Sequence, residues 1–198
     1  MNRNCFIVFI CLCIGLCICS CKNGEEGTNQ NTQEQKIVYN DKIQNVFFGV
    51  PLGATKEEVI EGFAKHDFYP ESYSTDSRLI FYKKSSKSYS FGDMNWRKIY
   101  INLSNNRFYS IEFSEPFKNK ESAIECFDSR LSTVSRKYSM YESPIDDTTS
   151  YKRFVGLTKS NQWIILHCYS YESFSHARWI TVDLVYGDNN FLGISDEL

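Results

Sequence analysis

The run Ile99-Tyr100-Ile101-Asn102-Leu103-Ser104-Asn105-Asn106-Arg107-Phe108-Tyr109-Ser110-Ile111-Glu112-Phe113 decides the fold of this chain. The side chains of Ile99, Ile101 and Leu103, and then those of Tyr109, Ile111 and Phe113, recur at every second position. Successive side chains of a strand point to opposite faces, so this alternation is typical of strands with one face on a core. Ser104–Arg107 supplies a turn between the two runs. The stretch therefore predicts two neighbouring strands of an antiparallel meander with its other face toward water.

Similar runs flank this hairpin. We expect strands at 46–50, 79–81 and 89–91 before it, and at 151–157, 163–171 and 179–186 after it. Thr55 and Glu58 have the spacing of a capping box, which predicts a helix that ends near residues 66–67. A second helix is predicted at about 120–138 by a stripe of apolar residues at helical spacing. Its members are Ile124, Phe127, Leu131, Val134 and Tyr138.

These elements predict an α+β fold in which two helices pack on an antiparallel β-sheet. The segments 48–63 and 113–127 both pass from a strand through a proline into a helix, at an offset of about 64 residues. A duplication would give two related halves at about 46–112 and 113–198, each with a strand, a helix and three or four further strands. Chance similarity between two helix starts is the alternative. Both halves would belong to a single domain at 37–198.

The N-terminal sequence predicts where the protein is located in the cell. Arg3 precedes an apolar run from Cys5 to Cys19, and small residues lead to Cys21. Positive residues, an apolar run of roughly 15 residues and then a cysteine are typical of a bacterial lipoprotein signal, so residues 1–20 would be removed and Cys21 would carry lipid. An uncleaved membrane helix and an ordinary secretory signal are the alternatives. Residues 22–36 contain no apolar side chain, which predicts a lipidated, disordered tether at 21–36.

Charge and cysteine content restrict the function further. The chain has 22 basic and 24 acidic side chains and a net charge of −2, so no basic face for nucleic acid is expected. Five of the eight cysteines would leave with the signal. Cys126 and Cys168 remain in the folded part, where they could form a disulfide or stay buried thiols.

The segment Phe47–Glu58, with its Phe-Gly-Val-Pro turn and Lys/Glu-rich helix start, resembles the opening of a group of uncharacterised Bacteroidota envelope lipoproteins. Residues 182–190 and 196–198 resemble the ends of those proteins. The resemblance implies a lipid-anchored protein of the bacterial cell envelope, on the outer membrane. The predicted fold is also similar to tandem beta-lactamase inhibitory proteins and small outer-membrane assembly lipoproteins. Those proteins act by binding other proteins, so the analogy implies a protein partner.

Catalytic chemistry has little support in the sequence. His66, His167 and His176 share no ligand spacing with a second histidine or cysteine, so no metal and no cofactor are predicted. His167 and Cys168 are adjacent on a predicted strand and point to opposite faces, which prevents a nucleophile–base pair between them. No catalytic residue is assigned. An envelope hydrolase would need two carboxylates, or Cys168 and a histidine, to meet in a cleft.

Aromatic residues are the remaining signal. The chain contains 15 Phe, 13 Tyr and 3 Trp, and four of them occupy outward positions of predicted strands: Tyr100, Trp163, Tyr169 and Tyr171. Such side chains provide large, rigid contact surfaces with a polar edge, as binding surfaces need. The alternative is that they only fill space in the core and on the sheet. The sequence predicts a non-enzymatic protein-binding or assembly module that uses these four residues. A surface glycan-binding lipoprotein is the alternative.

Overall fold

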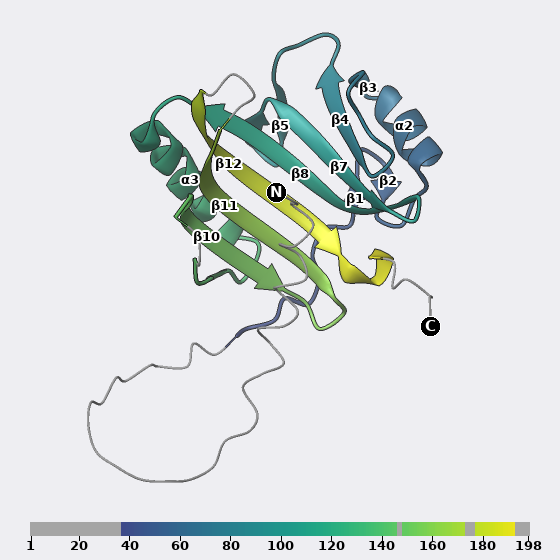
Figure 1. The fold of residues 1–198 in the computed structure, drawn as a ribbon. Helices are drawn as coiled ribbons and strands as arrows, with labels where there is room; N and C mark the ends of the chain where they lie inside the picture. Colours follow the sequence, from purple (N-terminus) through teal and green to yellow (C-terminus); the bar gives the residue numbers. More distant parts are fainter. Residues whose placement is uncertain (1–36, 146–147, 173–176, 193–198) are drawn as a thin grey trace, which may run out of the picture. The chain divides into compact units, whose positions relative to one another are not determined.

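The computed structural model describes residues 37–145, 148–172 and 177–192. The predicted signal, the lipid site Cys21 and the tether lie outside the described residues, as does His176. The elements are β1 Val46–Phe47, β2 Val50–Pro51, α2 Lys56–Ala64, β3 Phe68–Pro70, β4 Arg78–Lys83, β5 Tyr89–Phe91, β6 Met94–Trp96, β7 Lys98–Ser104, β8 Arg107–Phe117, α3 Lys120–Ser135, β9 Tyr141–Glu142, β10 Ser150–Leu157, β11 Gln162–Glu172, β12 Arg178–Asp188 and the 3₁₀ turn η1 Asn189–Phe191. Figure 1 shows their arrangement.

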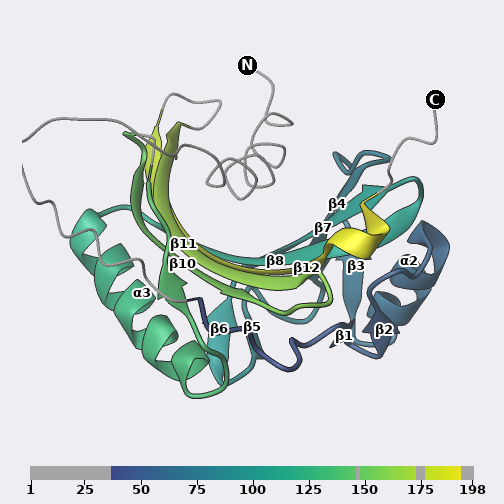
Figure 2. The same ribbon diagram turned by 90° about the horizontal axis from the view of Figure 1, so that it is seen from below.

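Eight strands form one antiparallel sheet in the order β3-β4-β7-β8-β12-β11-β10-β9. The predicted hairpin lies in its middle as β7 and β8. Asn105 and Asn106 form its two-residue turn with φ angles of 48° and 60°, a conformation that asparagine tolerates better than most residues. The sheet curves, and both described helices lie on its convex side (Figure 2).

The predicted fold class is wrong. The structure is mostly β: the three strands β8, β11 and β12 have 11 residues each, whereas α2 and α3 have 9 and 16. It is not an arrangement of two β-α-β halves with helices on a sheet. The predicted boundary at 112/113 falls inside β8, and β8 pairs with β12 from Ser110 to Phe117. Backbone hydrogen bonds thus join the two predicted halves into one continuous sheet.

A second correction concerns the predicted strand at 46–50. Phe48 and Gly49 have positive φ angles of 51° and 79°, so the chain reverses there and Val46–Phe47 pairs with Val50–Pro51 as a tight hairpin. A glycine in the turn accepts this conformation without steric cost, whereas Phe48 is an unusual residue for it. The predicted strand at 89–91 also differs, because β5 pairs only with β6 in a separate two-stranded sheet.

Both helices begin where their sequences predict. The Thr55 side chain accepts a hydrogen bond of 3.3 Å from the backbone N–H of Glu58, and the Glu58 carboxylate accepts one of 2.7 Å from the backbone N–H of Thr55. This is the predicted capping box, and it satisfies two N–H groups that a helix start leaves open. In α3 the buried residues are Ala123, Phe127, Arg130 and Val134. The buried face is therefore rotated from the predicted stripe and includes an arginine.

The core lies on the convex side of the sheet, between the sheet and the elements that pack there: α2, α3 and the hairpins β1–β2 and β5–β6. Phe47, Trp96 and Phe113 are fully buried there, and the Phe91 and Phe113 rings stack at 4.1 Å. Cys168 is buried in this core and Cys126 is half-buried; both are free thiols, so the disulfide alternative does not occur in the structure. None of the helices in the described part of the chain is long and apolar enough to cross a membrane.

Candidate functional site: the concave face of the sheet

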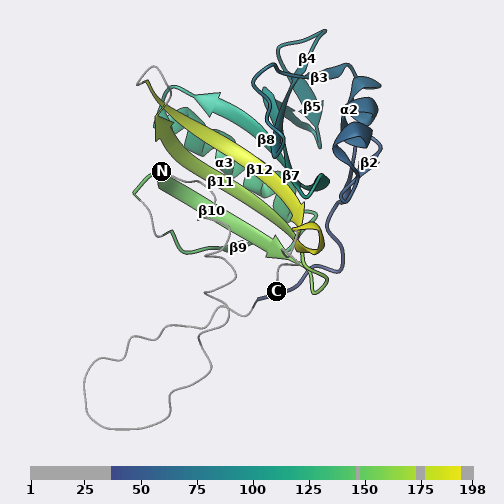
Figure 3. The ribbon, with the colours of Figure 1, turned by 45° about the vertical axis from the view of Figure 1, so that its right-hand side comes forward.

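The concave face of the sheet carries all four aromatic residues predicted as a binding surface. Cross-strand pairing places one side chain per strand in each row of this face. One row runs across six strands as Ile80, Tyr100, Glu112, Val185, Ile165 and Val155. Trp163, Tyr169 and Tyr171 share the face of Ile165 because they are an even number of residues from it on β11. No described helix or hairpin covers this side (Figures 2 and 3).

A hydrogen-bonded carboxylate lies at the centre of the concave face. Asp183 on β12 is 2% exposed, and it accepts hydrogen bonds from the Tyr169 hydroxyl at 2.8 Å and from the Thr181 hydroxyl at 2.7 Å. Ser114 Oγ lies 2.9 Å from Thr181 Oγ1. Because the single Thr181 proton goes to Asp183, Ser114 donates in that pair. A buried carboxylate is costly unless such donors surround it, so this network fixes the ring of Tyr169.

A second polar group surrounds Tyr100 on β7. Arg78 forms an ion pair of 3.0 Å with Glu112, and its guanidinium carbon lies 4.3 Å from the centre of the Tyr100 ring. Burial, together with the charges of Glu112 and Asp183, raises the pKa of Tyr100 above its ordinary value, so its hydroxyl is neutral at physiological pH. The cation over its face and the ion pair beside it hold Tyr100 in place.

The indole of Trp163 lies against a glycine of the next strand. Trp163 pairs with Gly187 across β11 and β12, and a Cβ atom built on Gly187 would collide with the six-membered ring of the indole. The indole Nε1–H donates a hydrogen bond of 2.9 Å to Asn189 Oδ1. Since no other residue leaves this space open, Gly187 lets the ring lie across the strand.

His167 belongs to the same face, between Trp163 and Tyr171 along β11. Its Nε2 lies 2.8 Å from Ser150 Oγ, and its ring centre lies 4.6 Å from that of Tyr169. Cys168, its neighbour in sequence, is buried on the convex side, so the two do not form a nucleophile–base pair, as the alternation predicts. The described residues contain no group of three or more histidine, cysteine or acidic residues that could hold a metal ion.

The four predicted residues differ in exposure. Tyr171 is 41% exposed, while Tyr100, Trp163 and Tyr169 are half-buried in the sheet surface. Trp179, which pairs with Tyr171, extends the aromatic surface onto β12. Sequence reasoning missed the residues that hold the aromatic rings: Asp183, Arg78, Glu112 and Gly187. The alternation of β12 places Asp183 on the outward face, but only the register shows that it meets Tyr169.

The chain matches no protein-family model, no curated protein and no solved structure.

Proposed function

We propose that this chain is a lipid-anchored protein of the bacterial cell envelope that binds another protein through the concave face of its sheet. The observation that carries the proposal is the common placement of Tyr100, Trp163, Tyr169 and Tyr171 on one curved face that no described element covers. Tyrosine and tryptophan give interfaces much contact area at little cost in side-chain entropy. The rings of Tyr100, Trp163 and Tyr169 are already held by the contacts described above, which reduces the cost of ordering them on binding.

The charges of this face suggest the chemistry of the partner. Among the described strand residues, Arg78, Lys98 and Arg153 share the concave side with two carboxylates, Glu112 and Asp183. These five described residues carry a formal charge of +1, although the whole chain has a net charge of −2. A partner with a convex surface that bears carboxylates would be complementary in shape and charge.

Site-specific photo-cross-linking tests this proposal. A photoreactive phenylalanine analogue replaces Tyr171 in the full-length protein, in the cells that naturally make it, and cross-linked products are identified by mass spectrometry. Tyr73 is the matched control, because it is 58% exposed and lies in the loop between β3 and β4. We expect one protein partner to cross-link in high yield from position 171 and not from position 73. The adduct should disappear when Trp163 and Tyr100 are both replaced by alanine.

Two results would contradict the proposal. Equal cross-linking from positions 73 and 171 would show that the concave face has no special role. A cross-link from position 171 to polysaccharide alone would favour the glycan-binding alternative, for which the indole of Trp163 lying across Gly187 would be a stacking platform.

A further inference from the structure

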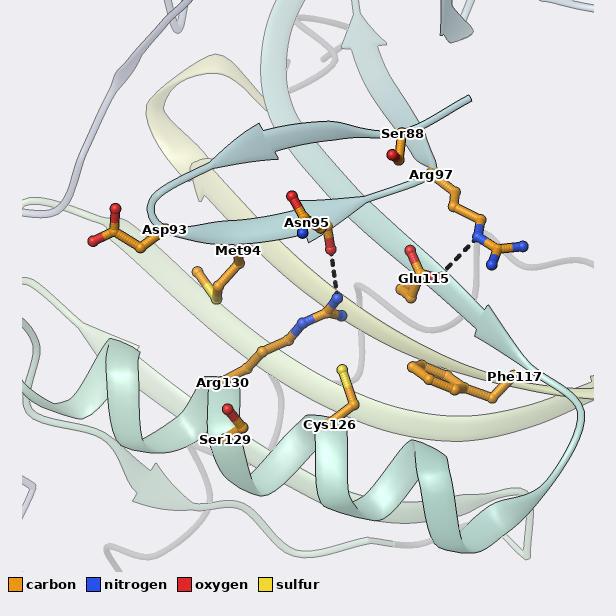
Figure 4. Close-up of a pocket in the computed structure, with 10 residues that line it drawn as sticks. All are labelled: Ser88, Asp93, Met94, Asn95, Arg97, Glu115, Phe117, Cys126, Ser129 and Arg130. Carbon is orange, nitrogen blue, oxygen red and sulfur yellow. Dashed lines mark hydrogen bonds and ion pairs between the residues drawn. The ribbon is translucent and has the colours of Figure 1, made fainter. Parts of the chain in front are cut away.

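A cavity of about 480 Å³ lies on the convex side of the sheet, between α3, the β5–β6 hairpin and β8. Its volume falls within the range of small-molecule sites. Figure 4 shows the side chains of Arg130 from α3 and Glu115 from β8 on its wall, with Arg130 bonded to the backbone carbonyl of Asn95 in the hairpin. The lining of the cavity includes the acidic residues Asp93 and Glu115, the cations Arg97 and Arg130, and the less polar Phe117 and Cys126.

Arg130 is the most deeply buried charged residue that lines this cavity. The residue is 6% exposed, and its guanidinium carbon lies 3.7 Å from the centre of the Trp96 ring. It donates hydrogen bonds of 2.7 Å to the carbonyl oxygen of Asn95 and 3.3 Å to that of Val182. Both acceptors are neutral, and within the described ranges no ion pair joins Arg130 to a carboxylate. A buried cation without a counter-ion is unfavourable, so this site favours an anion.

One carboxylate lies between two guanidinium groups. Glu115 Oε1 is 3.0 Å from Nε of Arg97, whose side chain is 62% exposed at the rim of the cavity. Figure 4 shows Glu115 between Arg97 and Arg130. Asp93, the other acidic residue that lines the cavity, lies at the opposite end of the residues drawn in Figure 4. The two cations and Glu115 therefore leave an excess of one positive charge at this end. That excess suits a monoanion, whereas a dianion such as a phosphate would be repelled by Glu115.

The rest of the wall is less polar. Phe117, Met94 and Cys126 line the cavity next to these charges, and burial raises the pKa of the Cys126 thiol, which is therefore neutral. A guanidinium presents parallel N–H groups that match the two oxygens of a carboxylate. We propose that the cavity binds a small organic carboxylate, with its anionic group beside Glu115 at the end that holds Arg130 and Arg97 and its apolar body against Phe117 and Met94. The ligand is either a free carboxylic acid or the C-terminal carboxylate of a peptide, which share this chemistry.

This site is independent of the proposed function, because it lies on the opposite side of the sheet from the concave face. The test uses the full-length protein in detergent and ¹⁹F NMR of 4,4,4-trifluorobutyrate, with 4,4,4-trifluorobutyramide as the neutral control. We expect the protein to broaden the carboxylate signal and not the amide signal. Inorganic phosphate should compete at least about tenfold more weakly than butyrate, since Glu115 repels the second charge.

Variants connect the signal to the cavity. Arg130→Gln should abolish carboxylate-specific broadening, with folding checked by circular dichroism. Glu115→Gln removes the repelling carboxylate and should tighten binding by about fivefold. Cys126→Phe fills the cavity without changing any charge, so it decides the question if Arg130→Gln does not fold. Broadening that is equal for acid and amide, or that survives Cys126→Phe, would overturn the proposal.

Competition distinguishes the two sources of the carboxylate. A short peptide with a free C-terminus and the same peptide with an amidated C-terminus are added to the protein with trifluorobutyrate. Displacement by the free peptide alone, at lower concentrations than butyrate, assigns the site to chain termini. Displacement by butyrate and not by either peptide assigns it to free acids.

Discussion

The Tyr169 hydroxyl donates a hydrogen bond of 2.8 Å to Oδ2 of Asp183, which is 2% exposed in the centre of the concave face. The two residues are on neighbouring strands, β11 and β12, and Tyr169 pairs with Thr181, the second donor to the same carboxylate. A side chain of the proposed binding surface therefore also satisfies a buried charge of the sheet. Structure and recognition are coupled at this position.

Tyr169→Phe should destabilise the fold although it removes a single oxygen atom. Asp183 would lose one of its two described hydroxyl donors while it stays buried. Removing a donor from a buried charged group costs about 1–3 kcal/mol in the free energy of unfolding. Urea denaturation of the variant and the parent protein measures the loss. Tyr171→Phe is the matched control, because this ring is 41% exposed and its variant should differ from the parent by less than about 0.5 kcal/mol.

Local chemistry explains which parts of the fold could be predicted from the sequence. The Thr55–Glu58 capping box, the turn at Asn105 and Asn106 and the alternation of β7 and β8 all depend on residues close together in the chain. Local signals of this kind can be recognised in the sequence alone. They also place Tyr100, Trp163, Tyr169 and Tyr171 on the outward face of their strands.

Those local signals do not show which strands pair when their residues are far apart in the chain. The pairing of β8 with β12 joins residues 110–117 to residues 180–187. Because this pairing crosses the predicted boundary at 112/113, the predicted arrangement of two halves is wrong. Contacts such as Arg78 with Glu112 or Arg130 with the carbonyl of Asn95 depend on long-range pairing in the same way. Arg130 lies outside the predicted apolar stripe of α3, and no local pattern indicates that it is buried. The ring that covers the Arg130 guanidinium belongs to Trp96, a residue of β6.

Gly187→Val should displace the indole of Trp163. The added side chain would occupy the space of the six-membered ring, and overpacking of this kind costs about 1–3 kcal/mol. The test is a double-mutant cycle with Trp163→Ala, followed by urea denaturation. Since the alanine variant removes the clash, the double variant should be more stable than the sum of the two single effects implies. Additive effects would mean that the ring does not lie against Gly187.

Cys21→Ala should abolish lipid attachment. The sequence predicts that the thiol of Cys21 takes the lipid after removal of residues 1–20. Cells that make the full-length protein are grown with a labelled fatty acid, and incorporation into the purified protein is measured. The Cys126→Ala variant is the control, because Cys126 is a half-buried thiol of the folded part and its loss should leave labelling unchanged. Label that persists in the Cys21 variant would contradict the lipoprotein prediction.

Glu115→Gln should change how stability depends on pH. Burial raises the pKa of Glu115 above its ordinary value of 4.5, and the opposing effects of Arg97 and Arg130 do not cancel that rise. The folded protein thus holds this proton more tightly than the unfolded chain does. The parent protein should lose stability as the pH rises from the ordinary value through the higher folded-state pKa, whereas glutamine has no proton to lose.

The expected result is a difference in the free energy of unfolding between the Gln variant and the parent. This difference shifts toward the variant as the pH rises from the ordinary value of 4.5 through the folded-state pKa, and it is constant above that pKa. Urea denaturation at a series of pH values measures it. Glu121→Gln, at an exposed position in the first turn of α3, is the control and should show no comparable shift. A difference that instead shifts toward the parent would mean that the ion pair with Arg97 outweighs the burial of Glu115. The cavity would then have less excess positive charge to offer a carboxylate.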